Sequence, residues 1–321
     1  MTISASGAVN FSDIKAEMGG SGAVSLSEYY GISAGLPASG EISMDDFRGE
    51  QFDVIDLATS TGSYSPRASR ATYVHIFAVG AGGSGGSSEY DTSINITTGV
   101  AASGGGGGGG VSYHKLAISD FTGSYTLTIG AGGAGVYSAG DHWIAGNAGG
   151  ATSVVGNLTS LTANGGSAGN ADEDSNLGTD TSTALAAAGG TASGGNQDNW
   201  TGGASGLAKR TGDTSGSASG GGAPAFSSSN YDGTDSYLGA TAGGLVSTKN
   251  DLPDVIQTYL SNRGQSLTLT DFDASSGVYQ LSSGGSESPT FGAGSGGACH
   301  GSGRQSGDGG DGVVIIIYEV T

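Results

Sequence analysis

Residues 1–50 carry short apolar and polar motifs that recur three times. The copies are Val9-Asn10-Phe11-Ser12-Asp13-Ile14, Val24-Ser25-Leu26-Ser27-Glu28-Tyr29 and Ile42-Ser43-Met44-Asp45-Asp46-Phe47. In each copy a polar residue can cap a first turn, an acid three residues later can close a capping box, and flanking apolar residues can staple the turn. The motifs therefore predict three helices of one or two turns.

Helices this short are marginal in isolation, so we expect residues 1–50 to dock on something. We interpret them as an attachment segment; a cap over the chain's own β core is the alternative. The expected attachment residues are Phe11, Ile14, Leu26, Tyr29, Met44 and Phe47.

From about residue 52 onward the apolar residues gather in short runs that are typical of β-strands. Strands are expected at 72–79, 111–118, 124–130, 151–155, 158–163 and 313–318. The run 313–318 is almost continuously apolar, as in a strand buried on both faces. We expect this last strand to pair with 72–79.

Glycine runs separate these strands. They lie at 104–110, 130–135, 189–195, 202–206, 220–222, 292–297 and 301–312. One interpretation is packed polyproline-II-type (polyglycine-II) helices, in which glycine lets backbones approach closely and bond to one another. The other is a set of turns at the end of a β-sandwich. Either way, residues 51–321 are expected to form an all-β, glycine-rich, β-sandwich-like domain.

Residues 245–283 break this pattern because they are poor in glycine. Within them, 252–260 has apolar residues on one stripe and reads as a helix that ends before Gly264. We expect an inserted, partly helical element here.

Composition and charge narrow the function further. Glycine supplies 66 of 321 residues, against a usual share of roughly 7%. The net charge is −19, with ten Lys and Arg scattered along the chain, which argues against nucleic-acid binding. The lone Cys299 excludes an intrachain disulfide. No secretory signal and no membrane-spanning run is visible, so we expect folding in the cytoplasm without membrane insertion.

The motifs that resemble catalytic or ligand sites lack their required context. The glycines at 80–85 match a dinucleotide fingerprint, but no helical pattern follows them. The four histidines show no spacing of a triad or zinc site, and the acids at 172–174 and 307–312 read as a solvated loop and a turn. We therefore expect no catalytic, cofactor-binding or metal-binding residue, and no enzyme activity.

Large side chains among the small residues of the loops are candidates for recognition, since aromatic residues on a rigid scaffold often anchor binding. The candidates are Tyr137, His142, Trp143, Trp200, Phe226, Tyr231 and Tyr237. The alternative is that they cover the edge of a thin core.

Two sets of residues resemble proteins of tailed bacteriophages. The motifs at 11–14, 26–30 and 42–49 resemble an N-terminal segment found on many tail and virion proteins. The stretches 76–83, 104–113, 125–133, 162–166 and 310–316 resemble the glycine-rich domain of tail fibres and tip adhesins. In such adhesins polyglycine helices pack as a sandwich and loops at one tip bind the host surface. The 245–283 insert departs from that pattern.

The resemblance implies a fibre-tip virion protein, assembled in the host cytoplasm, whose partners are other virion proteins and a host surface receptor. Its own copies are a further potential partner. The alternatives are a purely structural tail, baseplate or capsid-surface protein, and a polysaccharide-cleaving tailspike. A tailspike needs a pair of carboxylates in a cleft, and the sequence offers no recognisable pair.

Overall fold

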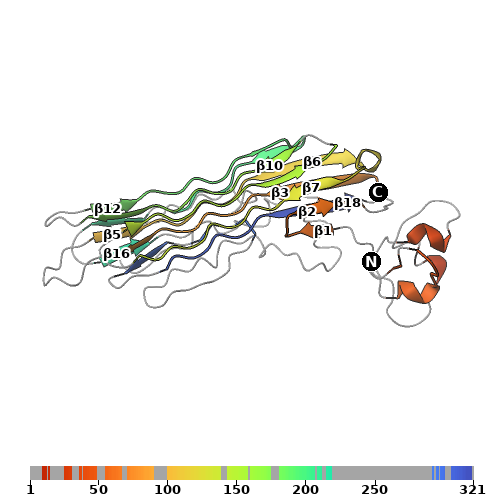
Figure 1. The fold of residues 1–321 in the computed structure, drawn as a ribbon, viewed down its shortest axis with the longest axis horizontal. Helices are drawn as coiled ribbons and strands as arrows, with labels where there is room; N and C mark the ends of the chain where they lie inside the picture. The colour runs from red at the N-terminus through yellow and green to blue at the C-terminus, as the bar shows by residue number, and fades with distance from the viewer. Residues whose placement is uncertain are drawn as a thin grey trace.

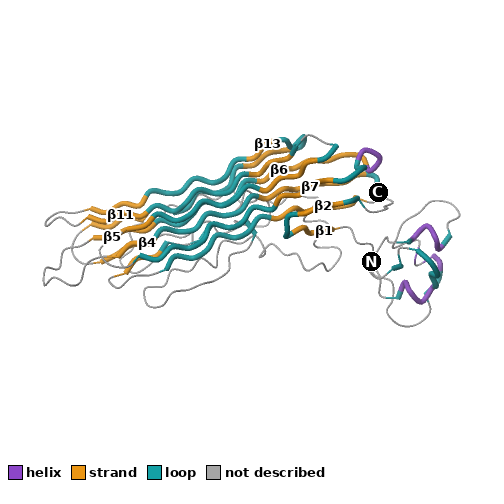
Figure 2. Tube along the Cα trace, viewed as in Figure 1, coloured by secondary structure: helices purple, strands orange, loops and turns teal. Residues whose placement is uncertain are grey.

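The computed structural model shows an elongated domain with sheets at both ends and parallel extended tracts between them (Figure 1, Figure 2). The residues it describes are 9–12, 14, 25–30, 36–37, 39–48, 55–66, 71–89, 100–138, 143–157, 160–174, 181–206, 208–211, 215–218, 291–292, 294–295, 297–300 and 305–319. The expected insert at 245–283, its helix at 252–260 and the glycine run 220–222 lie outside these residues.

One end, here called the base, is a β-sandwich of two five-stranded sheets. The first has the order β1 (Ile55–Ala58), β18 (Val313–Glu319), β3 (Tyr73–Val79), β6 (Val111–Ala117) and β14 (Asp198–Trp200). The second has the order β13 (Ala192–Ser193), β10 (Leu161–Ala163), β9 (Thr152–Val155), β7 (Tyr125–Thr128) and β2 (Gly62–Tyr64). All strand pairs in both sheets are antiparallel.

The core of the base lies between these sheets. Ile76 and Ile316 from the first sheet and Val154 and Leu161 from the second are all at most 1% exposed. The expected pairing of the last strand is confirmed, since β18 runs antiparallel to β3 with Ile316 opposite Ile76. Burial of consecutive residues along β18 confirms a strand covered on both faces.

The other end, here called the distal end, carries three small sheets. They are β11 (Ala171–Asp174) with β5 (Val100–Ser103) and β16 (Ser215–Ala218); β12 (Thr181–Ala184) with β15 (Ala208–Thr211); and β17 (Ala298–His300) with β4 (Ser87–Glu89) and β8 (Trp143–Ile144).

The glycine runs connect the two ends as extended tracts, here called the shaft (Figure 2). The tracts are 80–86, 104–110, 130–136, 145–151, 164–170, 185–191, 201–206, the described residues of 292–297, and 305–312. The base strands continue directly into the tracts, as β3 does into 80–86, without a turn. Strand β7 accordingly ends at Thr128, two residues before its expected limit of 130, whereas β3 and β18 keep their expected bounds to within one residue.

Along tract 80–86 successive backbone amides point to different neighbouring tracts, and the direction repeats every three residues. The amides of Gly80, Gly83 and Gly86 donate to tract 104–110, at Gly110, Gly107 and Gly104. Those of Ala81 and Ser84 donate to tract 145–151, at Gly150 and Asn147. In the third direction, Gly82 donates to Gly310 and Gly85 to Ser295 Oγ. The backbone donor–acceptor distances in this set are 2.8–3.1 Å. Three directions in three residues, with no bond inside the tract, is the geometry of polyproline-II helices packed side by side. The structure thus has packed polyglycine-II helices rather than glycine-rich turns.

The carbonyl groups of tract 80–86 extend the same lattice. Ala81 and Ser84 accept from Gly166 and Gly169, Gly82 accepts from Gly133, and Gly83 accepts from Ser295. Tract 80–86 is therefore bonded to tracts 104–110, 130–136, 145–151, 164–170, 305–312 and the residues at 292–297. Every residue of 80–86 is buried, yet all seven of its amides and the carbonyls of residues 81–84 are paired, which offsets the usual cost of burying them.

Glycine is needed in the shaft because there is no room for a Cβ atom. A Cβ on Gly107 would lie 2.0 Å from the carbonyl oxygen of Ala188, and one on Gly109 would lie 1.9 Å from that of Gly80. Backbone conformation is not the reason at these two positions, because neither glycine has a positive φ. Glycine is therefore required at these positions by the close spacing between backbones and not by turn geometry.

Single 3-10 turns take the place of the short helices expected at the N-terminus. They are η1 (Leu26–Tyr29) and η2 (Met44–Phe47), and residues 11, 12 and 14 are also helical. Part of the expected capping box is present, as the Ser43 amide donates to the Asp46 carboxylate at 2.6 Å. The backbone becomes extended again at Arg48, so the turn does not propagate.

We predict that Gly107→Ala and Gly109→Ala each destabilise the domain by about 2–3 kcal/mol or more, because the methyl group would force two hydrogen-bonded backbones apart. Chemical denaturation measures the loss. Gly62→Ala is the matched control: its Cβ meets nothing within 4 Å, so stability should change by less than about 1 kcal/mol. Equal effects at all three positions would contradict close packing of the shaft.

Candidate functional site at the distal end

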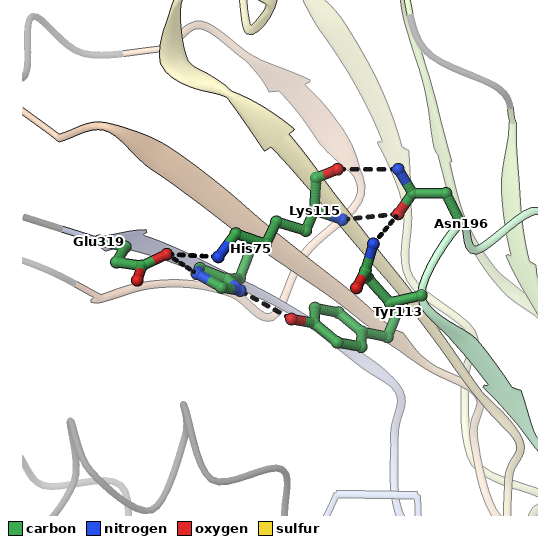
Figure 3. A network of polar contacts seen from close by, with 6 residues as sticks. His75, Tyr113, Lys115, Asn196 and Glu319 are labelled. Carbon is green, nitrogen blue, oxygen red and sulfur yellow. Dashed lines mark hydrogen bonds and ion pairs between the residues drawn. The ribbon is translucent and has the colours of Figure 1, made fainter.

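A polar network in the base ties three strands together (Figure 3). His75 on β3 contacts the Tyr113 hydroxyl on β6 through Nδ1 at 2.8 Å and the Glu319 carboxylate on β18 through Nε2 at 2.8 Å. Lys115 Nζ donates to the same carboxylate at 2.7 Å. The network therefore links β18, β3 and β6 at one level of the sheet.

The protonation states of this network favour a structural role. Burial lowers the pKa of His75 despite its hydrogen bond to the Glu319 carboxylate, which acts in the opposite direction. Burial, with the nearby Glu319 charge, raises the pKa of Tyr113 to about 12. Burial by itself would raise the pKa of Glu319, but the hydrogen bonds from Lys115 and His75 outweigh it and lower that pKa. A phenol with a raised pKa is a poor nucleophile, so these groups cross-link strands rather than forming an activated pair.

Trp200, an expected recognition residue, also belongs to the base. It lies on β14, is half-buried, and stacks on Tyr113 with ring centroids 6.0 Å apart. Nearby, Asn196 and Lys115 exchange two hydrogen bonds at 2.9 and 2.8 Å, which hold the edge strand against β6. Trp200 thus lies at the opposite end of the shaft from Tyr137 and Trp143.

Tyr137 and Trp143 lie at the distal end and are 56% and 55% exposed. Trp143 sits opposite Ser88 in the β8–β4 pair, while Tyr137 forms a bridge to Gln305. The Ser138 amide donates to Ser87 Oγ at 3.2 Å, so both stems of this loop are fixed on β4 or beside it. These aromatic side chains are therefore exposed on a rigid support.

Two exposed apolar residues of the distal end were missed by the sequence reasoning. Ile144 is 39% exposed beside Trp143, and Leu185 is 61% exposed at the start of tract 185–191. The three-residue period could have found Leu185, because Ala188 and Thr191, three and six residues later, are exposed as well. The other expected recognition residues, His142, Phe226, Tyr231 and Tyr237, lie outside the described residues.

The expected attachment residues pack together in the N-terminal segment and belong to one cluster of apolar residues with the core of the base. Ile14, Tyr29 and Phe47, the last apolar residue of each motif, have no exposed surface. Tyr29 packs edge-on against Phe47 at 5.7 Å and against Phe11 at 6.3 Å between ring centroids. Phe11, Leu26 and Met44 are half-buried and occupy the third position of each motif.

Asp308 and Asp311 in tract 305–312 receive hydrogen bonds from the shaft. Their carboxylates accept the amides of Gly135 at 2.6 Å and Gly132 at 2.8 Å, extending the lattice at its edge. Within the described part of the chain, no three His, Cys, Asp or Glu side chains gather as a metal site. None of the described helices is long and apolar enough to span a bilayer.

A depression of about 300 Å³ lies in the base between β1 and β2. Asp56, Leu57 and Tyr64 contribute to its lining, and the Tyr64 hydroxyl donates to Asp56 at 2.6 Å. The same hydroxyl lies 2.6 Å from that of Tyr318, and burial together with this contact raises the pKa of Tyr64. The phenol stays protonated and holds the sandwich corner closed.

We predict that the stability of the domain falls as pH drops below about 6.5, the ordinary pKa of histidine. In that window the unfolded chain binds protons that the buried His75 and His114 do not, so acid favours unfolding. Denaturation between pH 7 and 5 should show a shallower pH dependence in His75→Gln and in His114→Gln than in the wild type. An unchanged slope in both variants would contradict buried, neutral histidines.

No curated protein sequence matches this chain. A family model described as a glycine-rich domain does match it, over residues 59–319. The match spans more than three quarters of the chain and takes in the base strands from β2 onward, the shaft and the distal sheets. The chain therefore belongs to this glycine-rich domain family.

Proposed function

We propose that the chain is a virion protein of a tailed bacteriophage, of the tail-fibre or tip-adhesin type. In this proposal residues 1–50 attach it to another virion protein, and the distal end of the glycine-rich domain contacts the host surface. The protein carries out no reaction; it is assembled in the host cytoplasm and acts on the particle.

The observation that supports the proposal is that a stiff backbone shaft ends in exposed apolar and aromatic side chains. The shaft is a buried backbone lattice that separates the base from the distal end (Figure 1). At the distal end Tyr137, Trp143 and Leu185 are each more than half exposed. Exposed aromatic groups on a rigid support suit recognition, because little conformational freedom is lost on binding.

The N-terminal motifs support attachment in a similar way. Each motif buries its last apolar residue and leaves its third, Phe11, Leu26 or Met44, half-buried. Half-exposed apolar residues repeated over a small unit suit a docking surface, while Ile14, Tyr29 and Phe47 hold the unit together.

Substitutions in the N-terminal segment test the attachment role. The triple variant Phe11→Ala, Leu26→Ala, Met44→Ala should be lost from purified particles, because it removes the half-exposed apolar groups and keeps the buried ones. Immunoblotting of particles made by complementation measures incorporation. Trp143→Ala, changed at the opposite end, should be incorporated normally. Normal incorporation of the triple variant, or of a chain lacking residues 1–50, would refute the attachment role.

Competition for phage adsorption separates a receptor-binding protein from a purely structural virion part. Purified full-length chain added to host cells should block phage adsorption in a dose-dependent way, because it occupies the surface that the particle needs. The attachment triple variant should block equally well, since its distal end is unchanged. Cells that adsorb phage normally at saturating concentrations of folded chain would favour the structural alternative.

A further inference from the structure

The exposed side chains of four neighbouring shaft tracts form a regular array of rows. One residue in three is exposed along tract 164–170, at Asn164, Ser167 and Asn170, and the same spacing holds for Ala131, Ala134 and Tyr137. Since three residues make one turn, successive rows are roughly 9 Å apart along the shaft. The layer consists of tracts 130–136, 145–151, 164–170 and 185–191, which continue into or from β7, β9, β10 and β13.

Hydrogen bonds fix which residues share a row. Tract 145–151 is joined to 130–136 by bonds from Gly150 to Ala131 and from Asn147 Nδ2 to Ala134 O. It is joined to 164–170 by bonds from Gly146 to Gly169 and from Gly149 to Gly166. Tract 164–170 is joined to 185–191 by bonds from Ser167 to Ala188 and from Asn170 Nδ2 to Leu185 O. By this register the most distal row consists of Tyr137, Ile144, Asn170 and Leu185. The next row consists of Ala134, Asn147, Ser167 and Ala188.

These rows are exposed and carry no charge. All eight residues named in the two rows are exposed, and none is Asp, Glu, Lys, Arg or His. This is notable in a chain with 29 acids and 10 bases. The rows differ in size: the second has small side chains, whereas the distal one has three large apolar side chains and lies beside Trp143, which is itself 55% exposed.

The asparagine side chains of this surface are held in place with their acceptors available. Asn147 Nδ2 donates to Ala134 O at 2.7 Å, and Asn170 Nδ2 donates to Leu185 O at 3.2 Å. Among the described residues, no hydrogen bond reaches Oδ1 of either amide. Each therefore presents a fixed carbonyl oxygen beside an apolar group, at the boundary between the two rows.

We propose that the surface formed by Tyr137, Trp143, Ile144, Asn147, Asn170 and Leu185 binds a neutral saccharide of the cell envelope. The inference rests on the proposed host contact and names its chemical class. A sugar ring has apolar C–H faces that pack on aromatic and aliphatic side chains, and hydroxyl groups that donate to fixed amide oxygens. The uncharged surface matches an uncharged ligand, and the net charge of −19 disfavours polyanionic surfaces.

The two tryptophans of the chain give a direct measurement. Trp200→Phe keeps an aromatic ring to stack on Tyr113 and leaves Trp143 as the sole tryptophan. Titrating this variant with cellohexaose, maltohexaose and mannan oligosaccharides should produce a saturable change in Trp143 fluorescence with at least one of them. Tri-galacturonate, an anionic probe, should produce none at the same concentrations.

Matched variants locate the ligand. In calorimetric titrations with the responding saccharide, Trp143→Ala and Leu185→Ala should each weaken binding about tenfold, and Asn170→Ala should weaken it severalfold. Val155→Ala is the control, because Val155 is 47% exposed on β9 at the base end of the same layer. All four positions are exposed or partly exposed at the surface, so circular dichroism should show unchanged folding.

Treatment of host cells separates this inference from the proposed function. Binding of labelled chain should survive protease and be lost after periodate oxidation of the envelope sugars. Binding lost after protease and resistant to periodate would overturn the saccharide assignment and leave host contact standing. Failure of every neutral saccharide to change Trp143 fluorescence at millimolar concentration would also overturn it. Saccharide binding to the distal rows without any binding to host cells would uphold the site and refute the host-contact role.

Discussion

Hydrogen bonds between closely packed backbones are the interaction on which the rest of this structure depends. In tract 80–86 the amides point in turn to different neighbouring tracts, and the carbonyls accept from further ones. Such a lattice requires backbones close enough that a single methyl group would collide with a carbonyl oxygen, as at Gly107. The abundance of glycine follows from this spacing, and the low content of large side chains follows from the abundance of glycine.

The large apolar side chains of the glycine-rich domain core are correspondingly concentrated in the base. Strands β3 and β18 bring Ile76 and Ile316 together, and the second sheet closes over them with Val154 and Leu161. The base sets the register of the strands, and the strands pass that register into the tracts that continue them. The His75, Tyr113, Lys115 and Glu319 network adds a polar cross-link at the same level (Figure 3). A small core can thus organise a long molecule, because the shaft needs alignment more than it needs side-chain packing.

The arrangement of base, shaft and distal end is the physical basis of the proposed function. A shaft with few large side chains to rearrange is stiff, and in tract 164–170 the exposed positions recur every third residue. Among the described residues of the four tracts and their ends, large apolar side chains are exposed where the shaft ends, at Tyr137, Ile144 and Leu185. The same lattice that excludes side chains from the interior therefore arranges the surface ones in rows, which is the basis for the saccharide surface proposed here.

The sequence by itself determined the fold class, the main base strands and the pairing of the last strand with 72–79, because apolar runs and glycine boundaries are local signals. It left open whether the glycine runs were turns or packed helices, since the partners of each amide lie far away in the chain, as Gly82 and Gly310 do. It also grouped Trp200 with Trp143, although β14 holds Trp200 against Tyr113 at the opposite end. Only the tertiary structure decided which tracts are neighbours, and therefore which residues share a row, because register between distant backbones is set by packing and not by local pattern.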